Sequence, residues 1–500
     1  RSLPHGDSQA VLAAMKSLGF ASLLSSRPCK ERDIILAVVA ARILRASPKL
    51  STTRFWKTRT LADDAGVANI TENEIYAAMD WLLTRQPSIE KKLAQRHIKQ
   101  GDVVLYDLSS SYFEGRHCPM AKLGYNRDGK HGKLQVNYGL LCNAQGCPVS
   151  ISVFDGNTSD TKTLLPAVTK LQNNFGVKTF IMVGDRGMIS QASIDVLKEH
   201  HTGVQWITAL KSCQIKTLLT QGHLQPDLFD QRNLFELSHF DYPGERLIAC
   251  KNHELAKKRA LTRISLLEAT EKSLAQVEKM VVSGKLADKD KIGVRVGRVI
   301  DKYKVAKHFL LNIADKKFSF ERNQESIDVE AMLDGIYMIR TNVKSETLNS
   351  DDAVRTYKSL AQVERAFRTM KTVDLHVRPI HHRTEDRVRS HIFLCMLAYW
   401  IEWHMRKAWG ALLFHDEHPN EKRDPVAPAK RSTSALKKAQ SKKTADETPV
   451  HSFRTLLDFL GTIVRNTCRP KGADSASTFF MTTQPNPEQL RALNLIAQIM

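Results

Sequence analysis

Apolar positions in the first hundred residues recur with the period of an α-helix. The stretch 31–46, ERDIILAVVAARILRA, carries its apolar side chains on a helical period. The stretch 71–85 opens with Thr71 and Glu74, which have the spacing of a capping box. We therefore expect the N-terminal fifth of the chain to be an all-α module.

Beyond this module the pattern changes to that of β-strands. The run DVVLYDL is apolar enough for a central strand, and LQVNYGLLC and PVSISVF alternate around a turn at 143–146, as the strands of a hairpin do. Helical spacing returns at 160–174 and 190–200, and each helix is followed by an apolar run, at 177–183 and 204–210. The order β-β-β-α-β-α-β predicts an α/β fold with a ribonuclease H-like mixed sheet, in which three antiparallel strands precede parallel ones.

The remaining chain interrupts this sheet and then completes its core. A charged helical stretch at 253–281 and a strand-like run at 335–342 predict an inserted α+β lobe, and a further helix is expected at 386–408. The segment that follows is rich in Lys, Ser, Ala and Pro and has almost no large apolar residue. The predicted organisation is an N-terminal helical module (1–100), a core in two parts (101–210 and 346–412), the inserted lobe (211–345), a flexible basic linker (413–450) and a small helical tail (451–500) with helices at 451–466 and 487–500.

Charge changes the picture, because the chain has 74 Lys and Arg against 53 Asp and Glu, a formal net charge of +21. Residues 1–60 alone hold eleven Lys and Arg against three acids. Such an excess favours a polyanionic partner. The most apolar run, IFLCMLAYWI at 392–401, is ten residues long, too short to span a bilayer, so we expect a buried core helix and no membrane partner. Nucleic acid is the partner that remains.

Cysteine and histidine positions argue against a zinc finger. The eight Cys are scattered, and Cys142 and Cys147 flank a turn without a second pair of ligands. We therefore expect free thiols in a reducing cytoplasm. Four histidines, His376, His381, His382 and His391, follow no zinc spacing, and we expect them to contact DNA or to pack.

Three acidic residues lie at positions where their charge requires an explanation. Asp107 closes the apolar run VVLY and Asp185 closes FIMVG, so both lie at the ends of predicted strands, where burial without a partner is costly. Glu364 lies between Tyr357 and Lys371 at intervals of seven residues, and seven residues bring side chains to nearly the same face of one helix. Together the three acids suggest a metal site. Taken singly, Asp107 could cap a strand, Asp185 could belong to a turn and Glu364 could form a surface ion pair.

The segments that carry these acids resemble a known family. YDLSSSYFEG around Asp107, VGDRGM around Asp185 and YKSLAQVERAFRTMK around Glu364 are similar to the motifs of DDE transposases of bacterial insertion sequences, in particular the insertion-sequence-four group. Tyr357, Glu364 and Lys371 match the Tyr-x2-Arg-x3-Glu-x6-Lys signature of that group. The signature Arg is Leu360 here, and Arg365 or Arg368 could take over its phosphate contact.

The resemblance implies an enzyme that cuts and joins DNA. It implies that Asp107 bridges two Mg²⁺ ions, with Mn²⁺ as a substitute, and that Asp185 and Glu364 each hold one. Hard oxygen ligands suit these ions, and two ions about 3.5–4 Å apart can activate the attacking oxygen and stabilise the leaving oxygen of a phosphodiester. Tyr357, Lys371, Arg365 and Arg368 would bind phosphates, and Arg186 would support the site.

By the same resemblance, the partners are the terminal inverted repeats and target DNA, and a homo-oligomer forms on two element ends at the bacterial nucleoid. Two alternatives remain open from the residues alone. One is a DNA-binding protein without chemistry, which would explain the charge but not the three acids. The other is a ribonuclease H-like nuclease that lacks strand transfer.

Overall fold

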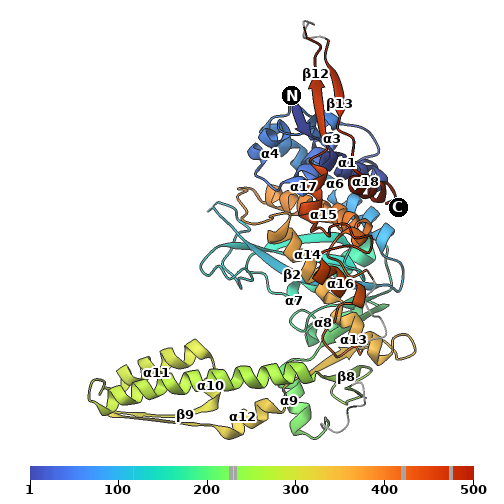
Figure 1. Cartoon of the computed structure of the whole chain (residues 1–500). Helices are drawn as coiled ribbons and strands as arrows, with labels where there is room; N and C mark the ends of the chain where they lie inside the picture. Colours follow the sequence, from blue (N-terminus) through green and yellow to red (C-terminus); the bar gives the residue numbers. More distant parts are fainter. Residues whose placement is uncertain (116, 225–228, 230–232, 418–423, 472–476, 500) are drawn as a thin grey trace. The chain divides into compact units, whose positions relative to one another are not determined.

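The computed structural model describes residues 1–115, 117–224, 229, 233–417, 424–471 and 477–499 (Figure 1). The chain divides into two compact units. Unit 1 comprises 1–208, 355–422 and 430–500, and unit 2 comprises 209–354 and 423–429. Each unit is described by itself below.

The mixed sheet of unit 1 has the strand order β4-β3-β2-β5-β6. Strand β2 pairs antiparallel with β3 and parallel with β5, β3 pairs antiparallel with β4, and β5 pairs parallel with β6. The predicted mixed sheet, with three antiparallel strands followed by parallel ones, is therefore confirmed, and so is the predicted pairing of the first strand with a later parallel strand. The strands are β2 (Val103–Tyr112), β3 (Gln135–Asn143), β4 (Pro148–Asp155), β5 (Phe180–Val183) and β6 (Val204–Ala209).

Strand β2 is longer than its apolar run suggests. The sequence pattern ends the strand at about Asp107, but β2 continues to Tyr112 in full register with β3, where Asp107 lies opposite Leu140. The extension consists largely of serines, of which Ser110 and Ser111 are fully buried. Their hydroxyls take part in hydrogen bonds, so these small polar residues fit a buried strand without an energetic penalty. Asp107 therefore lies in the middle of a strand.

The close approach of β2 and β3 depends on a glycine. The phenol of Tyr106 crosses over Gly139 and donates a hydrogen bond to the carbonyl oxygen of Thr163, at 3.1 Å. A Cβ at residue 139 would overlap the Tyr106 ring. Tyr106 in this way ties β2 to helix α7 (Thr161–Thr169), which the short π-helix η1 (Lys170–Asn174) extends.

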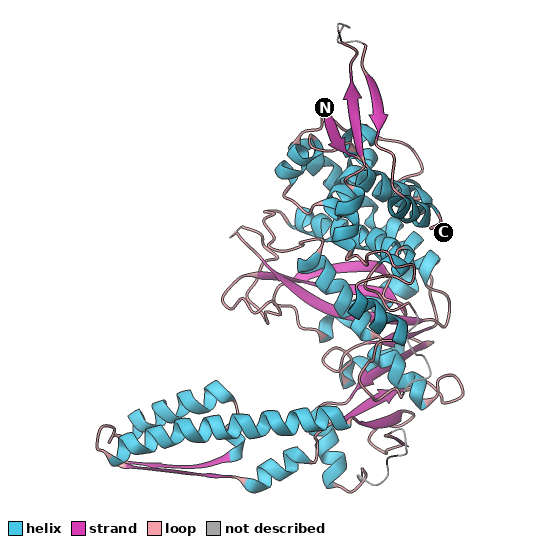
Figure 2. Ribbon diagram, in the orientation of Figure 1, coloured by secondary structure: helices cyan, strands magenta, loops and turns pink. Residues whose placement is uncertain are grey.

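Helix α15 is the centre of the helical layer of unit 1 (Figure 2). It packs against α3, α6 and β4, and its apolar stretch 392–401 is buried, as predicted. Thr71 and Glu74 form the predicted capping box at the start of α6. The helices of this layer are α1 (Gly6–Ser17), α2 (Phe20–Leu24), α3 (Lys30–Leu44), α4 (Lys49–Trp56), α5 (Leu61–Asp64), α6 (Glu72–His97) and α15 (Glu385–Ala408), and α8 (Gln191–His200) links β5 to β6.

The two ends of the chain meet in unit 1, which the sequence pattern does not indicate. Strand β1 (Ser2–Pro4) pairs with β12 (Val464–Cys468), and α1 packs against α17 (Phe453–Leu460) and α18 (Pro487–Ala497). Residues 1–100, expected to form a module of their own, therefore belong to the same compact unit as the sheet. Strand β13 (Phe479–Thr482) pairs with β12, so the expectation of a helix up to residue 466 is wrong at its end.

The predicted linker at 413–450 contains ordered structure where it is described. Helix α16 (Thr433–Ser441) is capped by Ser432, and Ala435 on it is buried. Val426 and Val450 are buried as well. The expectation of a linker without secondary structure is therefore wrong for 433–441. Ala435 is the one buried residue of this helix, and composition alone does not reveal a helix with so small an apolar contact. Residues 418–423 lie outside the described chain.

Unit 2 contains three antiparallel strands, a long helix and a hairpin. The strands pair in the order β11-β8-β7 and are β7 (Leu234–Leu237), β8 (Arg246–Lys251) and β11 (Ile336–Thr341). Helix α10 (His253–Val282) packs against α11 (Lys289–Tyr303) and the hairpin of β9 (Phe309–Ala314) and β10 (Lys317–Arg322), as Figure 2 shows. The unit also includes α9 (Ser212–Thr220) and α12 (Gln324–Ala331).

We expect Gly139→Ala to lower the free energy of unfolding by about 1–3 kcal/mol, because the added methyl group overpacks the contact with Tyr106. Gly293→Ala is the matched control, since nothing lies within 4 Å of a Cβ on this helical glycine and alanine favours the helix. Chemical denaturation of both variants checks the prediction. Equal stability of the Gly139→Ala variant and the wild type would show that the contact is not tight.

Candidate active site

The pairing of β2 with β5 brings two acids to the same edge of the sheet. Leu105 pairs with Val183, so Asp107 and Asp185 each lie two residues beyond this pair, in the direction in which both strands run. Asp185 follows the end of β5, and its carboxylate accepts a hydrogen bond from the backbone N–H of Arg186, at 2.7 Å. Asp107 lies half-buried in β2, and Asp185 is exposed.

Electrostatics show that the third acid belongs to the same neighbourhood. The pKa of Asp107 is raised to about 7, first by burial, and then by the negative charges of Asp185 and Glu364. The backbone N–H of Leu108 and the guanidinium of Arg127 oppose this rise. Asp185 and Glu364, far apart from Asp107 in sequence, therefore lie close enough to it in the folded chain for their charges to act on it, and Arg127 is a cation within the same range.

Glu364 is presented by a helix that packs on the sheet. On α14 (Leu360–Arg368), Val363, Ala366 and Phe367 are buried, and the Phe367 ring meets that of Tyr138 on β3 edge-on, with centroids 5.7 Å apart. The opposite face of α14 exposes Glu364 together with Arg365 and Arg368. The helix therefore buries its apolar stripe and leaves an acid flanked by two cations at the surface.

The stretch 357–371 is not the single helix that the heptad spacing predicts. Helix α13 (Ser350–Lys358) ends before Ser359, α14 follows, and residues 369–373 form the π-helix η3. Ser359 interrupts the regular hydrogen bonds, because its N–H is shared between the carbonyls of Arg355 and Thr356 and its hydroxyl donates to Thr356. The π-helix then adds a residue to its turn, so the seven-residue intervals do not run along one regular α-helix.

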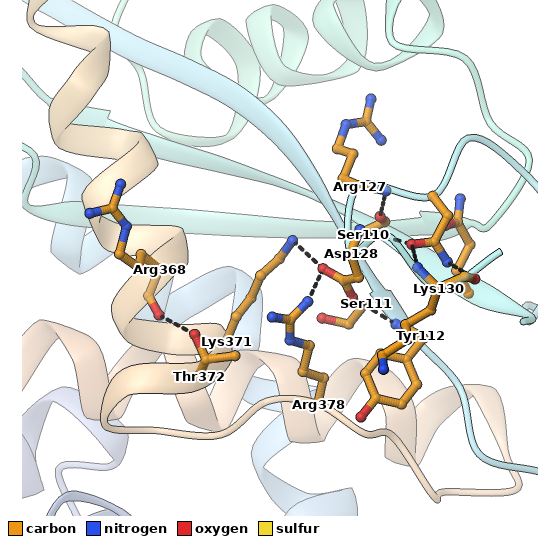
Figure 3. A network of polar contacts seen from close by, with 12 residues as sticks. Ser110, Ser111, Tyr112, Arg127, Asp128, Lys130, Arg368, Lys371, Thr372 and Arg378 are labelled. Atoms are coloured by element: carbon orange, nitrogen blue, oxygen red, sulfur yellow. Dashed lines mark hydrogen bonds and ion pairs between the residues drawn. The ribbon is translucent and has the colours of Figure 1, made fainter. Parts of the chain in front are cut away.

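Tyr357 and Lys371 consequently have different partners. Tyr357 lies beside Asp185, and its pKa is raised by burial and by the Asp185 carboxylate. Lys371 is buried, and its Nζ lies 3.0 Å from Oδ1 of Asp128 (Figure 3). Burial lowers the pKa of Lys371, and the attraction of Asp128 acts against this shift. The structure therefore places Lys371 in an internal ion pair, whereas the resemblance made it a phosphate ligand.

Asp128 is the centre of a polar cluster that sequence reasoning missed. Its side chain is 1% exposed, and it binds Lys371, Arg378 and the backbone N–H of Tyr112, the last at 3.1 Å (Figure 3). The cluster joins the loop before β3 to the end of β2 and to the segment after α14. In the sequence, Asp128 lies in the run YNRDGKHG, which reads as an ordinary polar turn, so no local signal marks it.

Two further groups next to the acids were also missed. Arg127 forms an ion pair with Asp160, which directly precedes α7. A Cβ placed on Gly187 would lie 3.8 Å from Oδ2 of Asp185 and 3.9 Å from Oδ2 of Asp160, so these two carboxylates approach the same backbone position. Arg186 is exposed beside them. Neither Arg127 nor Asp160 belongs to a sequence pattern that distinguishes it from surface residues.

The acids suit divalent cations in their chemistry, since carboxylate oxygens are the preferred ligands of Mg²⁺ and Mn²⁺. The oxygens of Asp107, Asp185 and Glu364 do not all lie within 4.8 Å of one another in the described structure. A single ion bound by all three residues would require their carboxylate oxygens to lie closer together. Two ions about 3.5–4 Å apart, each about 2.0–2.2 Å from its oxygens, allow the outer carboxylates a wider separation.

Basic residues near the N-terminus are divided between the interior and the surface. Arg42 and Lys49 are buried against His391, whose Nδ1 lies 3.4 and 3.5 Å from their nitrogens. Burial lowers the pKa of Lys49 to about 7, and Arg59 pairs with Asp7. The residues that stay exposed are Arg1, Lys16, Arg27, Lys30, Arg45, Arg54 and Lys57. Part of the charge excess of 1–60 is therefore internal, and His391 packs in the interior.

Comparison with known proteins identifies the family of the chain. The family model of the transposase DDE domain matches residues 99–401, more than half of the chain, and the chain belongs to that family. It is a DDE transposase. No curated protein matches it. Among solved structures, it is similar to the piggyBac transposase in a cryo-EM structure of the synaptic complex with hairpin DNA, with a TM-score of 0.38 and 8% identity, over 90% of this chain and 76% of that chain. No helix among the described residues has the length and apolar character needed to cross a membrane.

We expect Asp128→Ala to destabilise the chain by roughly 3–5 kcal/mol, because it leaves Lys371 buried without its carboxylate partner. Asp80→Ala is the control, since the pair of Asp80 and Arg387 is 3.6 Å long and exposed, and such pairs contribute less than about 1 kcal/mol. Urea denaturation of both variants decides the matter. A loss of stability no larger than that of the control would show that Asp128 is not needed to compensate the buried charge of Lys371.

Asp107 should also make the metal-free protein less stable as the pH rises. Its pKa is about 7 in the folded chain and near 4 in the unfolded chain, so between these values the folded state holds a proton that the unfolded state has released. Stability contributed by the protonated form is therefore lost between pH 4 and pH 7. Asp107→Asn cannot ionise, so its stability relative to the wild type should increase over this range in chelator-treated samples. A difference that is constant with pH would contradict the assignment.

Proposed function

We propose that the chain is the transposase of a bacterial insertion sequence of the insertion-sequence-four type, and that it binds element ends, cleaves DNA and transfers the freed strand to target DNA. The observation that carries the proposal is the juxtaposition of Asp107 and Asp185 by β2 and β5, with Glu364 close enough to raise the pKa of Asp107. The motifs around Tyr357, Glu364 and Lys371 support the group assignment, and Leu360 is a departure from it.

The three acids would hold two Mg²⁺ ions, with Mn²⁺ as a substitute. The charges of Asp185 and Glu364 both act on Asp107, which suits a ligand shared by both ions. Asp185 and Glu364 would hold one ion each. When bound, such ions activate the attacking oxygen and stabilise the leaving oxygen of a phosphodiester. The protein prepares the site by concentrating negative charge that neither Arg127 nor the neighbouring backbone N–H groups neutralise completely.

Strand cleavage and strand transfer then use one set of residues. In cleavage, the oxygen of water bonds to phosphorus and the bond to the 3′-oxygen breaks, which leaves a 3′-OH at the element end. In transfer, this 3′-OH bonds to a phosphorus of the target, and a target 3′-oxygen leaves. Arg365, Arg368 and Arg186 are exposed near the acids and would bind the phosphates of the DNA. Tyr357 lies beside Asp185 and would orient it, whereas Lys371 would position the loop of Asp128.

DNA-end recognition is assigned to the helices of residues 1–100. Their exposed basic residues, including Arg45, Arg54 and Lys57, support contact with phosphates. Two element ends must be cut and joined together, which favours a homo-oligomer assembled on DNA. The chain's net charge of +21 fits this large polyanionic partner.

The proposed function is tested with the full-length protein, an element-end duplex and Mg²⁺. We expect cleavage and joining, and we expect Asp107→Asn, Asp185→Asn and Glu364→Gln each to reduce both on the order of 10³-fold or more, because each removes a ligand for the charge that activates the reaction. Asp155→Asn is the control, because Asp155 also ends a strand of this sheet but is exposed on β4. Chelation of Mg²⁺ should abolish both steps.

The same assay separates the alternatives. Metal-dependent cleavage without any joined product would indicate a nuclease of the same fold. Binding without cleavage by the wild type would indicate a DNA-binding protein without chemistry. Full activity of the Glu364→Gln variant would contradict the proposed three-acid site.

A further inference from the structure

Two histidines and a cysteine that the transposase chemistry does not use come together in unit 1. His97 is the last residue of α6, Cys147 directly precedes β4, and His404 lies on α15. One potential ligand atom of each lies within 4.8 Å of the others. In the described part of the chain, this is the one group of three His, Cys, Asp or Glu side chains that meets this distance.

The cluster is held by surrounding structure. The backbone N–H of Cys147 donates to Oδ1 of Asn143, at 2.9 Å, so the turn between β3 and β4 fixes the thiol. Helices α6 and α15 pack against each other, and the ring centroids of His97 and His404 are 5.5 Å apart. The thiol is fully buried. Its position does not depend on a mobile surface side chain.

His404 contains a nitrogen that the protein leaves without a partner. Its Nε2 atom is buried and forms no hydrogen bond. A buried ring nitrogen without a partner is costly, because desolvation is not offset by an interaction. If the cluster were only packing, this nitrogen would be expected to face a donor or acceptor. A bound cation would supply the interaction that is otherwise missing.

We propose that His97, Cys147 and His404 bind one zinc ion. Thiolate and imidazole are the ligands that zinc prefers, and they differ from the oxygen ligands of the three-acid site. Zinc bonds of about 2.0–2.3 Å in a tetrahedron need the three atoms to approach somewhat more closely, which small side-chain movements can achieve. The ion would shield the unpartnered nitrogen of His404.

The protonation states of the ligands suit this role. The pKa of His97 is lowered to about 4 and that of His404 to about 3, in both cases mainly by burial, with a smaller contribution from the nearby cations Arg96 and Lys407. Both rings are therefore neutral at physiological pH, with lone pairs to donate. Burial raises the pKa of the Cys147 thiol, so binding breaks its S–H bond, releases the proton to solvent and forms the sulfur–zinc bond. The thiolate charge also offsets the field of Arg96 and Lys407.

Trp400 changes its partner when the ion binds. In the metal-free chain, its indole N–H donates to Nε2 of His97, at 3.0 Å, and it also faces the sulfur of Cys147. Zinc would take the lone pair of His97, and the indole N–H would remain with the thiolate, as a hydrogen bond that supports a metal ligand. Since three side chains fill three positions, the fourth is left for water. The ion would then join α6, the hairpin of β3 and β4, and α15.

Cobalt substitution of the full-length protein tests the site directly. After removal of metals, one equivalent of Co²⁺ should produce a sulfur-to-cobalt charge-transfer absorption, because Cys147 is a ligand. The three-acid site has no sulfur and cannot produce this band. The band should be absent in Cys147→Ala and retained in Cys395→Ala, which removes another buried free thiol, on α15. Absence of the band in the wild type would overturn the proposal, independently of how any variant folds.

Zinc content supplies a second measurement. After dialysis against excess Mg²⁺, we expect one zinc per chain in the wild type and in Cys395→Ala, and at least a tenfold loss of zinc affinity in His404→Gln, consistent with removal of one of three ligands. Circular dichroism verifies that the variants are folded. Zinc retained equally by folded Cys147→Ala or His404→Gln would contradict the proposed ligands. Loss of DNA cleavage with an intact zinc site would leave this inference standing and would count only against the proposed function.

Discussion

The parallel pairing of β2 with β5 is the constraint on which the active site depends. It fixes the register that sets Asp107 level with Asp185, and it does so with the most rigid part of the fold, a sheet whose strands are buried on both sides of the pair. Burial penalises the charge of Asp107, and the negative charge of Asp185 adds to this penalty. The raised pKa of Asp107 is the measure of that cost. In the proposed site a divalent cation would remove this cost, so the geometry that destabilises the metal-free chain would favour metal binding.

The positive charges around the acids are arranged so that they do not cancel the negative charge of the three carboxylates. Arg127, whose positive charge lowers the pKa of Asp107, forms an ion pair with Asp160. Lys371 and Arg378 form ion pairs with Asp128. These pairs hold the loop before β3, the end of β2 and the segment after α14 in place. Arg186 remains exposed beside Asp185, and Arg365 and Arg368 remain exposed on the helix of Glu364, where under the proposed function they would meet phosphates without entering the acid cluster. Internal ion pairs thereby separate the structural charges from those available to DNA.

The fold of the central region could be predicted well because its signals are local and strong. Apolar runs of strand length alternate with helical spacing, and the capping box of Thr71 and Glu74 marks a helix start by itself. The predicted order placed β2 beside β5, and with it Asp107 beside Asp185. The extension of β2 was missed because buried serines look polar in a sequence, although hydrogen bonds satisfy them in the sheet. The pairing of β1 with β12 was missed because it joins residues more than 460 positions apart, for which no periodic pattern exists.

The sequence named the three acids of the candidate site but not the residues that surround them. Seven-residue spacing assumed one α-helix for Tyr357, Glu364 and Lys371, but the structure divides this stretch at Ser359 and ends it in a π-helix. Asp128 and Asp160 act through tertiary contacts alone. His97, Cys147 and His404 are likewise brought together by packing and have no spacing that a sequence motif could express.

Diffraction from crystals soaked in Mn²⁺, recorded at a wavelength where manganese scatters anomalously, tests the central claim most directly. The account predicts two anomalous peaks about 3.5–4 Å apart, with an oxygen of Asp107 bound to both and oxygens of Asp185 and Glu364 each bound to one. Peaks held by Asp128 or Asp160 without Asp107, or no peak beside Asp107 at saturating Mn²⁺, would contradict it.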